Sequence, residues 1–187
     1  MTGHQEDTIN SLTYSALVSE LIKPGNSFIE GMPPGSAALL HTSVGLMVSV
    51  IPLEEAIYND ATSDDAIKNL GQCEYYLEAM ATELSFDYFV DSPTPTGSSG
   101  ELAYELRMAA ADILTKTMDA VIHKKAVPTA LFYDKMDYVR RLLDTFYELN
   151  NIARDDVLSK NIETLSKKPC RRRGMRYTDI NENGEEA

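Results

Sequence analysis

Apolar residues recur at helical spacing along nearly the whole chain, and this periodicity limits the possible folds more than any other feature. Residues three and four apart lie on one face of a helix, so such a repeat predicts amphipathic helices. No segment shows the alternation of apolar and polar residues that is typical of a half-buried strand. The expected fold class is therefore all-α, a helical bundle. The expected helices cover about residues 7–23, a segment starting near Ser36, 62–85, 101–125, 129–150 and 154–167.

Proline and glycine predict where these helices are interrupted. Lys23-Pro24-Gly25-Asn26 ends the first helix, and Pro33-Pro34 excludes a regular element before the second. Residues 91–100, which read D-S-P-T-P-T-G-S-S-G, predict a flexible connection. Ser63 is a plausible N-cap for the third helix. We therefore expect one all-α domain over residues 1–168 and a separate tail over 169–187.

Pro52 lies inside the apolar segment that follows Ser36. Proline in a helix interior removes one hydrogen bond and clashes with the carbonyl four residues back, at a cost of about 3 kcal/mol. The sequence therefore predicts one of two distortions. The helix kinks between about Val48 and Pro52, or it breaks near Val50-Ile51 and restarts with Pro52 in the first turn. A restart would place Glu54 and Glu55 favourably near the new helix start.

Two segments carry a resemblance to a known family. Residues 45–57 read G-L-M-V-S-V-I-P-L-E-E-A-I, and residues 69–77 read N-L-G-Q-C-E-Y-Y-L. They resemble the MazG-like, all-α nucleoside triphosphate pyrophosphohydrolases, which have G-L-x-x-E-x-x-E-L-x-x-A-I and E-L-G-D-x-x-Y-Y-L. Residues 156–165 resemble the family's E-V-L-x-x-N-I-x-K-L, with Asn161 at the asparagine. The resemblance covers about residues 36–168.

The resemblance implies a lost metal site. The family's four acidic ligands fall on Ser49, Pro52, Asn69 and Gln72, none of which is acidic here. Two carboxylate pairs on neighbouring helices would hold Mg²⁺, which polarises the phosphate and activates water. We therefore expect no metal, no cofactor and no catalytic residue. The resemblance also implies a homo-oligomer, because the family builds its pocket from paired subunits.

A site without carboxylates no longer repels phosphate, so a nucleotide can bind there without a metal ion. Side chains at the former ligand positions can donate hydrogen bonds. His41, Tyr76 and Asn161 stand at family positions near the pocket, although His41 fits a packing or capping role equally well. An alternative is that the pocket has decayed. The predicted ligand-binding residues are His41, Ser49, Lys68, Asn69, Gln72, Tyr76, Asn161, Lys167, Lys168 and Arg171.

The net charge of −12 argues against general nucleic-acid binding by the body of the protein. The charge is uneven, because a basic cluster over residues 167–176 precedes an acidic end. One interpretation is a solvated tail, and the other is a cluster that meets phosphates or an acidic partner.

Composition bounds the location and the chemistry. A chain of 187 residues with 43% hydrophobic residues suits a single domain with a sizeable core. We find no basic-then-apolar leader and expect no segment of membrane-spanning length, hence no membrane partner. Cys73 and Cys170 fit no zinc or redox spacing, and Cys73 is expected to be buried. These features predict a cytoplasmic protein.

Three functions follow from these patterns. The leading hypothesis is a catalytically inactive MazG-like protein that binds and sequesters a nucleotide or a nucleotide-derived signal. Residues 119–125 resemble longer phage and bacterial members, and in a phage such capture would counter a host defence. The first alternative is a non-catalytic interaction module that inhibits or scaffolds a host protein. The second alternative is a pyrophosphohydrolase with an altered site.

Overall fold

Every regular element in the described part of the chain is an α-helix. The computed structural model describes residues 32, 35–87, 94–127 and 129–166. From Gly35 onward these residues belong to one compact unit that begins at Pro33. The all-α fold class is confirmed, whereas the helix expected over residues 7–23 lies outside the described residues. The helices are α3 (Ser36–Asn59), α4 (Asp64–Leu84), α5 (Ser99–Ile122), α6 (Thr129–Asn150) and α7 (Arg154–Ser166).

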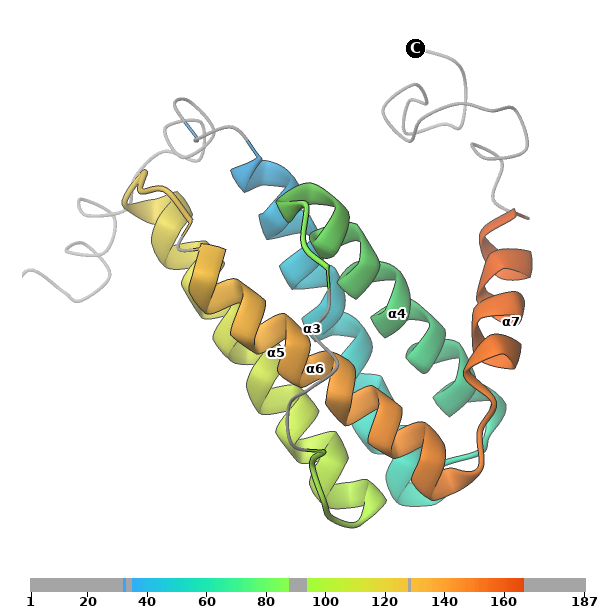
Figure 1. Cartoon of the computed structure of the whole chain (residues 1–187). Helices are drawn as coiled ribbons and strands as arrows, with labels where there is room; N and C mark the ends of the chain where they lie inside the picture. The colour runs from blue at the N-terminus through green and yellow to red at the C-terminus, as the bar shows by residue number, and fades with distance from the viewer. Residues whose placement is uncertain (1–31, 33–34, 88–93, 128, 167–187) are drawn as a thin grey trace, which may run out of the picture. The chain divides into compact units, whose positions relative to one another are not determined.

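The helix α3 packs extensively on both α4 and α5, while α6 packs on α5 and also reaches α4 (Figure 1). The short helix α7 packs on α4. Between the four long helices lies a continuous apolar core, in which Leu46, Leu70, Ile113 and Met136 are almost completely buried. The apolar residues that recur at helical spacing on α6 from Met136 to Phe146 are buried. They are Met136, Val139, Leu142, Leu143 and Phe146.

Two polar contacts show that α3 and α5 run in opposite directions. The hydroxyl groups of Ser43 and Thr117 lie 2.9 Å apart and share a hydrogen bond. Further along α3, Glu54 forms an ion pair with Arg107 at 3.2 Å. From the first contact to the second, the residue number rises from 43 to 54 on α3 and falls from 117 to 107 on α5. The two helices therefore lie side by side and antiparallel.

The predicted cap of α4 is confirmed. The Ser63 side chain accepts a hydrogen bond from the backbone amide of Ala66 at 3.2 Å. Asp64 and Asp65 follow in the first turn, where negative charge favours the helix dipole. The helix ends one residue earlier than expected, because Ser85 adopts a left-handed conformation with φ of 51°.

The boundaries expected for α5 were wrong at both ends. The helix begins at Ser99, within the segment predicted to be a flexible connection. Ser98 and Glu101 form a capping box, in which each side chain bonds the backbone amide of the other residue. The helix ends at Ile122, because the chain turns at Lys124 with φ of 50°. The pattern Ser-x-x-Glu was a readable signal for the true start.

We expect Ser98→Ala to lower the free energy of unfolding by about 1 kcal/mol, because it removes the N-cap acceptor and half of the capping box. Urea denaturation of the two proteins measures the difference. Thr96→Ala, an exposed position just before the cap, serves as the control and should change stability little. Equal effects of the two substitutions would argue against the cap.

The predicted break at Pro52 is wrong. The helix α3 continues from Ser36 to Asn59 with Pro52 inside it, so Glu54 and Glu55 do not stand in a first turn. The proline ring and the Val48 residue that loses its hydrogen bond both lie on the exposed side of α3. Water can therefore satisfy the Val48 carbonyl while the inner face stays packed. A kink between about Val48 and Pro52 stays a prediction.

The helix α3 also overturns the expectation that no segment reaches membrane-spanning length. It is long and apolar enough to cross a membrane, judged by length and composition alone. Its inner face packs against α4 and α5, and core helices of soluble proteins satisfy the same criterion. The informative property is that α3 carries apolar residues on its outer side as well.

Candidate functional site

Two of the four former metal-ligand positions, Ser49 and Pro52, lie on α3, and neither provides a free donor. Ser49 is buried, and its hydroxyl donates to the carbonyl of Gly45 on the same helix at 2.8 Å. Serine within a helix commonly bonds the carbonyl four residues back. The Ser49 hydroxyl is therefore engaged within its own helix, and its role as a donor to a ligand stays a prediction. Pro52 is exposed and offers no polar side-chain atom.

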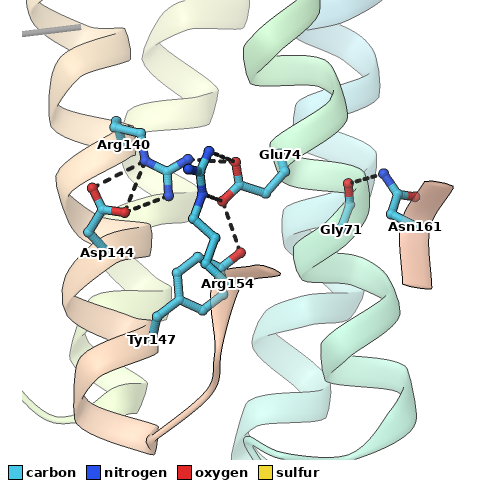
Figure 2. Close-up of polar contacts among 7 residues, drawn as sticks. All are labelled: Gly71, Glu74, Arg140, Asp144, Tyr147, Arg154 and Asn161. Carbon is cyan, nitrogen blue, oxygen red and sulfur yellow. Dashed lines mark hydrogen bonds and ion pairs between the residues drawn. The ribbon is translucent and has the colours of Figure 1, made fainter. Parts of the chain in front are cut away.

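The predicted residues Gln72 and Asn161 do come together, at the contact between α4 and α7. Gln72 Nε2 donates to Asn161 Oδ1 at 3.1 Å. Asn161 Nδ2 donates to the carbonyl of Gly71 at 2.7 Å, as Figure 2 shows. A Cβ atom on Gly71 would lie 2.8 Å from Asn161 Cβ, so only glycine permits this approach. These amides hold α7 against α4 in the described structure.

A groove of about 250 Å³ lies beside this contact, between α4 and α7. Lys68, Gln72 and Asn161 line it, so three predicted residues share one site. Lys160 adds a second positive charge but forms an ion pair with Asp64 at 2.5 Å. The hydrogen bond from Lys160 and its charge hold the pKa of Asp64 below its usual value. The remaining lining residues are Asp65, Ile67 and Thr164.

The other predicted residues do not line this groove. His41 is exposed on α3, and its ring lies edge-on to Tyr76 with centroids 6.1 Å apart. Tyr76 lies directly over Gly45, at the contact between α3 and α4. Asn69 is half-buried on α4. Residues 167–171, which include the predicted Lys167, Lys168 and Arg171, lie outside the described residues.

We expect Gly45→Ala to lower the free energy of unfolding by about 1 to 3 kcal/mol, because the new methyl group overlaps the ring of Tyr76. The gain in helix propensity, about 1 kcal/mol, opposes this loss. Thermal or urea unfolding measures the net effect. Adding Tyr76→Ala should relieve the overlap and reveal positive coupling between the two sites. Gly100→Ala is the matched control, because its Cβ would only touch Tyr58 at 3.5 Å.

A buried ionic cluster centred on Glu74 was not predicted from the sequence. The Glu74 carboxylate, in a residue only 4% exposed, accepts hydrogen bonds from three side chains (Figure 2). Arg140 Nη1 lies 2.5 Å from it, Arg154 donates at 3.0 and 3.1 Å, and the Tyr147 hydroxyl donates at 3.0 Å. Arg140 also binds Asp144 at 2.7 Å. The cluster ties α4 to α6 and to the start of α7.

Near neutral pH, Glu74 and Arg140 keep their charges and Tyr147 keeps its proton. Burial alone would raise the pKa of Glu74, but hydrogen bonds from Arg154 and Arg140 and their charges lower it. Burial would lower the pKa of Arg140, yet the bond to Glu74 raises it. Burial and the Glu74 charge raise the pKa of Tyr147. Such groups neither accept nor release protons near neutral pH, so the cluster suits a structural role.

The neighbouring Cys73 is buried, as expected, and unsuited to nucleophilic chemistry. Its residue is fully inaccessible, and burial with the charge of Glu74 raises the pKa of its thiol. A sequence signal for the cluster did exist. Glu74 stands at helical spacing from the buried Leu70 and Leu77, which indicates a carboxylate pointing into the core. Such a carboxylate requires a cationic partner.

Within the described ranges, no group of three or more histidine, cysteine, aspartate or glutamate side chains is placed to hold a metal ion. Glu54, two residues after Pro52, pairs with Arg107. No family model matches the chain, and no match was found among curated proteins or solved structures.

Proposed function

We propose that this chain is a non-catalytic protein-interaction module that binds its partner through the outer side of α3 and α5. Ten large apolar side chains are exposed among the described residues, and eight of them lie on these two helices. This concentration is the observation that carries the proposal. The α3–α5 face consists of Val44, Val48, Ile51, Tyr58, Tyr104, Met108, Met118 and Ile122.

The spacing places these residues in one stripe on each helix. Val44, Val48 and Ile51 are separated by four and three positions, as are neighbours on one side of a helix. The bond between Ser43 and Thr117 joins positions adjacent to Val44 and Met118. At the other end, Tyr58 and Tyr104 line a common cavity. The two stripes therefore lie side by side along the contact between α3 and α5.

An apolar face of this extent favours an interaction over a purely solvated surface. Single exposed apolar residues are ordinary, whereas contiguous patches mark places where another molecule binds. A helix that is apolar on every side is normally buried, and the outer side of α3 remains exposed in the described structure. The proposal agrees with the resemblance to MazG-like proteins, since a scaffold that has lost its acidic metal ligands can still bind a partner through its surface.

Comparative affinity purification from the source cells tests the proposal. Tagged wild type is compared with the face variant Val48→Glu/Met108→Glu and with Ile162→Glu, which alters an equally exposed apolar side chain on α7. Quantitative mass spectrometry should show partners that wild type and Ile162→Glu retain and the face variant loses. Partners retained equally by all three proteins would contradict a role for the α3–α5 face.

A second candidate is capture of a nucleotide without cleavage, in the groove between α4 and α7. Lys68 and Lys160 provide positive charge there, and the amides of Gln72 and Asn161 provide hydrogen bonds. The two aspartates of the groove oppose a phosphate ligand, which places this candidate second.

Calorimetry with nucleoside triphosphates in EDTA tests the second candidate. Binding should weaken with salt and be lost in Lys68→Glu, since the attraction is electrostatic. Truncation after Ser166 tests the basic tail in the same assay. Absence of binding heat in the full chain rejects capture, and metal-dependent pyrophosphate release would instead support an altered hydrolase.

A further inference from the structure

We infer that the partner on the α3–α5 face is a basic amphipathic helix. Its apolar side packs along the face, and a lysine or arginine near one of its ends enters the cavity that Tyr58 and Tyr104 line. The inference rests on the proposed function and names the chemistry of the partner. Three features of the face carry it: an acidic end, the walls of that cavity, and the course of the two apolar stripes.

One end of the α3–α5 face carries an excess of negative charge. Glu55 is exposed within the α3 stripe, four residues after Ile51 and three before Tyr58, so it lies on the same side of the helix. Glu101 and Glu105 border the cavity at this end. A partner that covered this end with apolar groups alone would bury three carboxylates without a counter-charge, at a large cost in free energy.

The cation nearest to these carboxylates in the sequence is already paired. Residues 49–59 and 99–110, which form this half of the two helices, contain one basic residue, Arg107. Arg107 forms its ion pair with Glu54 at 3.2 Å. The last turn of α3 contains no basic residue, although the carboxyl end of a helix attracts positive charge. The missing positive charge is therefore a property expected of the partner.

The cavity at the acidic end suits a long basic side chain. Its volume is about 460 Å³, and its walls combine two tyrosine rings with two carboxylates. Tyr58 is 70% exposed, and its ring lies over Gly100 of α5, where an added Cβ would stand 3.5 Å from Cε1. Arg107 lies 5.3 Å from the centre of the Tyr104 ring, so a guanidinium already contacts one of the two rings. The exposed ring of Tyr58 offers the same favourable contact to a cation of the partner.

Both carboxylates of the cavity keep one oxygen for a partner in the described structure. Glu101 accepts two hydrogen bonds from Ser98, and both use Oε2. Glu105 accepts a hydrogen bond from the Tyr138 hydroxyl, also through Oε2. The bonds from Ser98 hold the pKa of Glu101 below its usual value, so this carboxylate is ionised at neutral pH. The two Oε1 atoms can therefore accept the strong hydrogen bonds that ammonium and guanidinium groups donate to carboxylates.

The two stripes favour a helical partner over an extended one. The α3 stripe covers residues 44–58, a length of about 21 Å that a helix of about four turns matches. A helix with apolar residues three and four apart can pack its ridges between the stripes of α3 and α5. An extended segment binds by adding a strand to a sheet edge, and every regular element of the described chain is a helix.

Selection of peptides on the immobilised full chain tests the inference. The library displays random peptides of about 18 residues in an alanine-rich frame, which favours helices. Wild type is compared with Val48→Ser/Met108→Ser, a neutral face variant that removes apolar surface without adding charge. Peptides that bind only wild type should repeat apolar residues at helical spacing and carry lysine or arginine at one end. Fluorescence anisotropy of a selected peptide gives its dissociation constant, and binding should weaken as salt rises.

Two substitutions locate the cation of the selected peptide. Glu55→Lys should weaken binding at least about tenfold, and replacing the basic residue of the peptide with glutamate should restore binding to this variant. Tyr58→Leu keeps an apolar residue and should weaken binding about two- to fivefold, because the aromatic contact is lost. Glu78→Lys makes the same charge change at an exposed position of α4 and should leave the affinity unchanged. Circular dichroism spectra like that of wild type verify that each variant is folded.

Some outcomes overturn the inference and leave the proposed function standing. They are selected peptides that need the face but lack a basic residue, binding that Glu55→Lys does not change, and a wild-type dimer that the neutral face variant dissociates. A library that yields no face-dependent peptide also overturns the inference, and the cellular partners lost by Val48→Glu/Met108→Glu then decide the proposed function separately. A chain that floats with phosphatidylcholine vesicles through this face, and retains every cellular partner without it, overturns both.

Discussion

Replacing Glu74 with alanine is expected to lower the free energy of unfolding by about 3 to 5 kcal/mol, the largest effect of any single substitution considered for this chain. The loss arises because Arg140, in a side chain only 10% exposed, keeps its charge while its closest partner disappears. Tyr147 also loses its acceptor in a buried position. Equilibrium denaturation in urea measures the difference directly.

Two further variants distinguish the loss of the ion pair from the loss of side-chain packing as the cause of the lower stability. Glu74→Leu/Arg140→Leu removes both charges and should recover most of the lost stability, because a well-packed apolar pair replaces a buried ionic pair at little cost. Glu78→Ala, one turn further along α4 and exposed, should change the free energy of unfolding by less than about 0.5 kcal/mol. A double variant as unstable as Glu74→Ala would refute this account of the cluster.

The same cluster predicts how stability depends on acid. The folded state holds the pKa of Glu74 below its ordinary value of 4.5. The stabilisation is therefore fully present above that ordinary value and is lost as the pH falls through the lower, folded-state pKa. The urea midpoint of wild type should therefore fall as the pH is lowered from 4.5. Glu74→Gln, which carries no titrating group at the site, should show a flatter dependence.

Pro52→Ala is expected to raise the free energy of unfolding by about 2 to 3 kcal/mol. The helix α3 already continues through this position, so alanine adds a backbone hydrogen bond to Val48 and removes the clash of the ring. Thermal unfolding and urea denaturation both report the gain. Because Pro52 is exposed, the substitution leaves the packed inner face of α3 unchanged.

Pro95→Ala is the control, because Pro95 lies outside any helix. That change should leave stability equal or slightly lower, since proline restricts the unfolded chain. A loss of stability in Pro52→Ala would indicate that α3 needs a distortion at this point.

Local sequence signals predicted the helices well, and tertiary contacts explain the exceptions. The helix over residues 129–150 was predicted to its exact bounds, because its apolar positions keep one phase from Met136 to Phe146. The break predicted at Pro52 is absent because packing of the inner face of α3 outweighs a local defect on the exposed side. The Ser98 capping box was legible but was assigned to a loop rich in serine, proline and glycine.

The contacts of the candidate site could be predicted from the sequence only between residues of the same helix. Lys68 and Gln72 share a face of α4, so their presence in one groove follows from helical spacing. Glu74 instead meets Arg140 and Arg154 across 66 and 80 residues of sequence. Helical spacing shows that Glu74 points inward but does not name distant partners. Likewise, α3 is apolar on both its inner and its outer side, so its sequence alone does not show which side is buried.

The way α7 is attached has a consequence for how the molecule opens. The other helices share a continuous core, whereas α7 packs on α4 and adds little more than Val157 and Leu165 to the buried apolar residues. Segments with few buried contacts exchange their backbone hydrogens through small openings that leave the remaining structure folded. We expect the amides of α7 to exchange before those of α3 and α4. A protease that cuts only unfolded backbone should accordingly cleave α7 while the four-helix core is still intact.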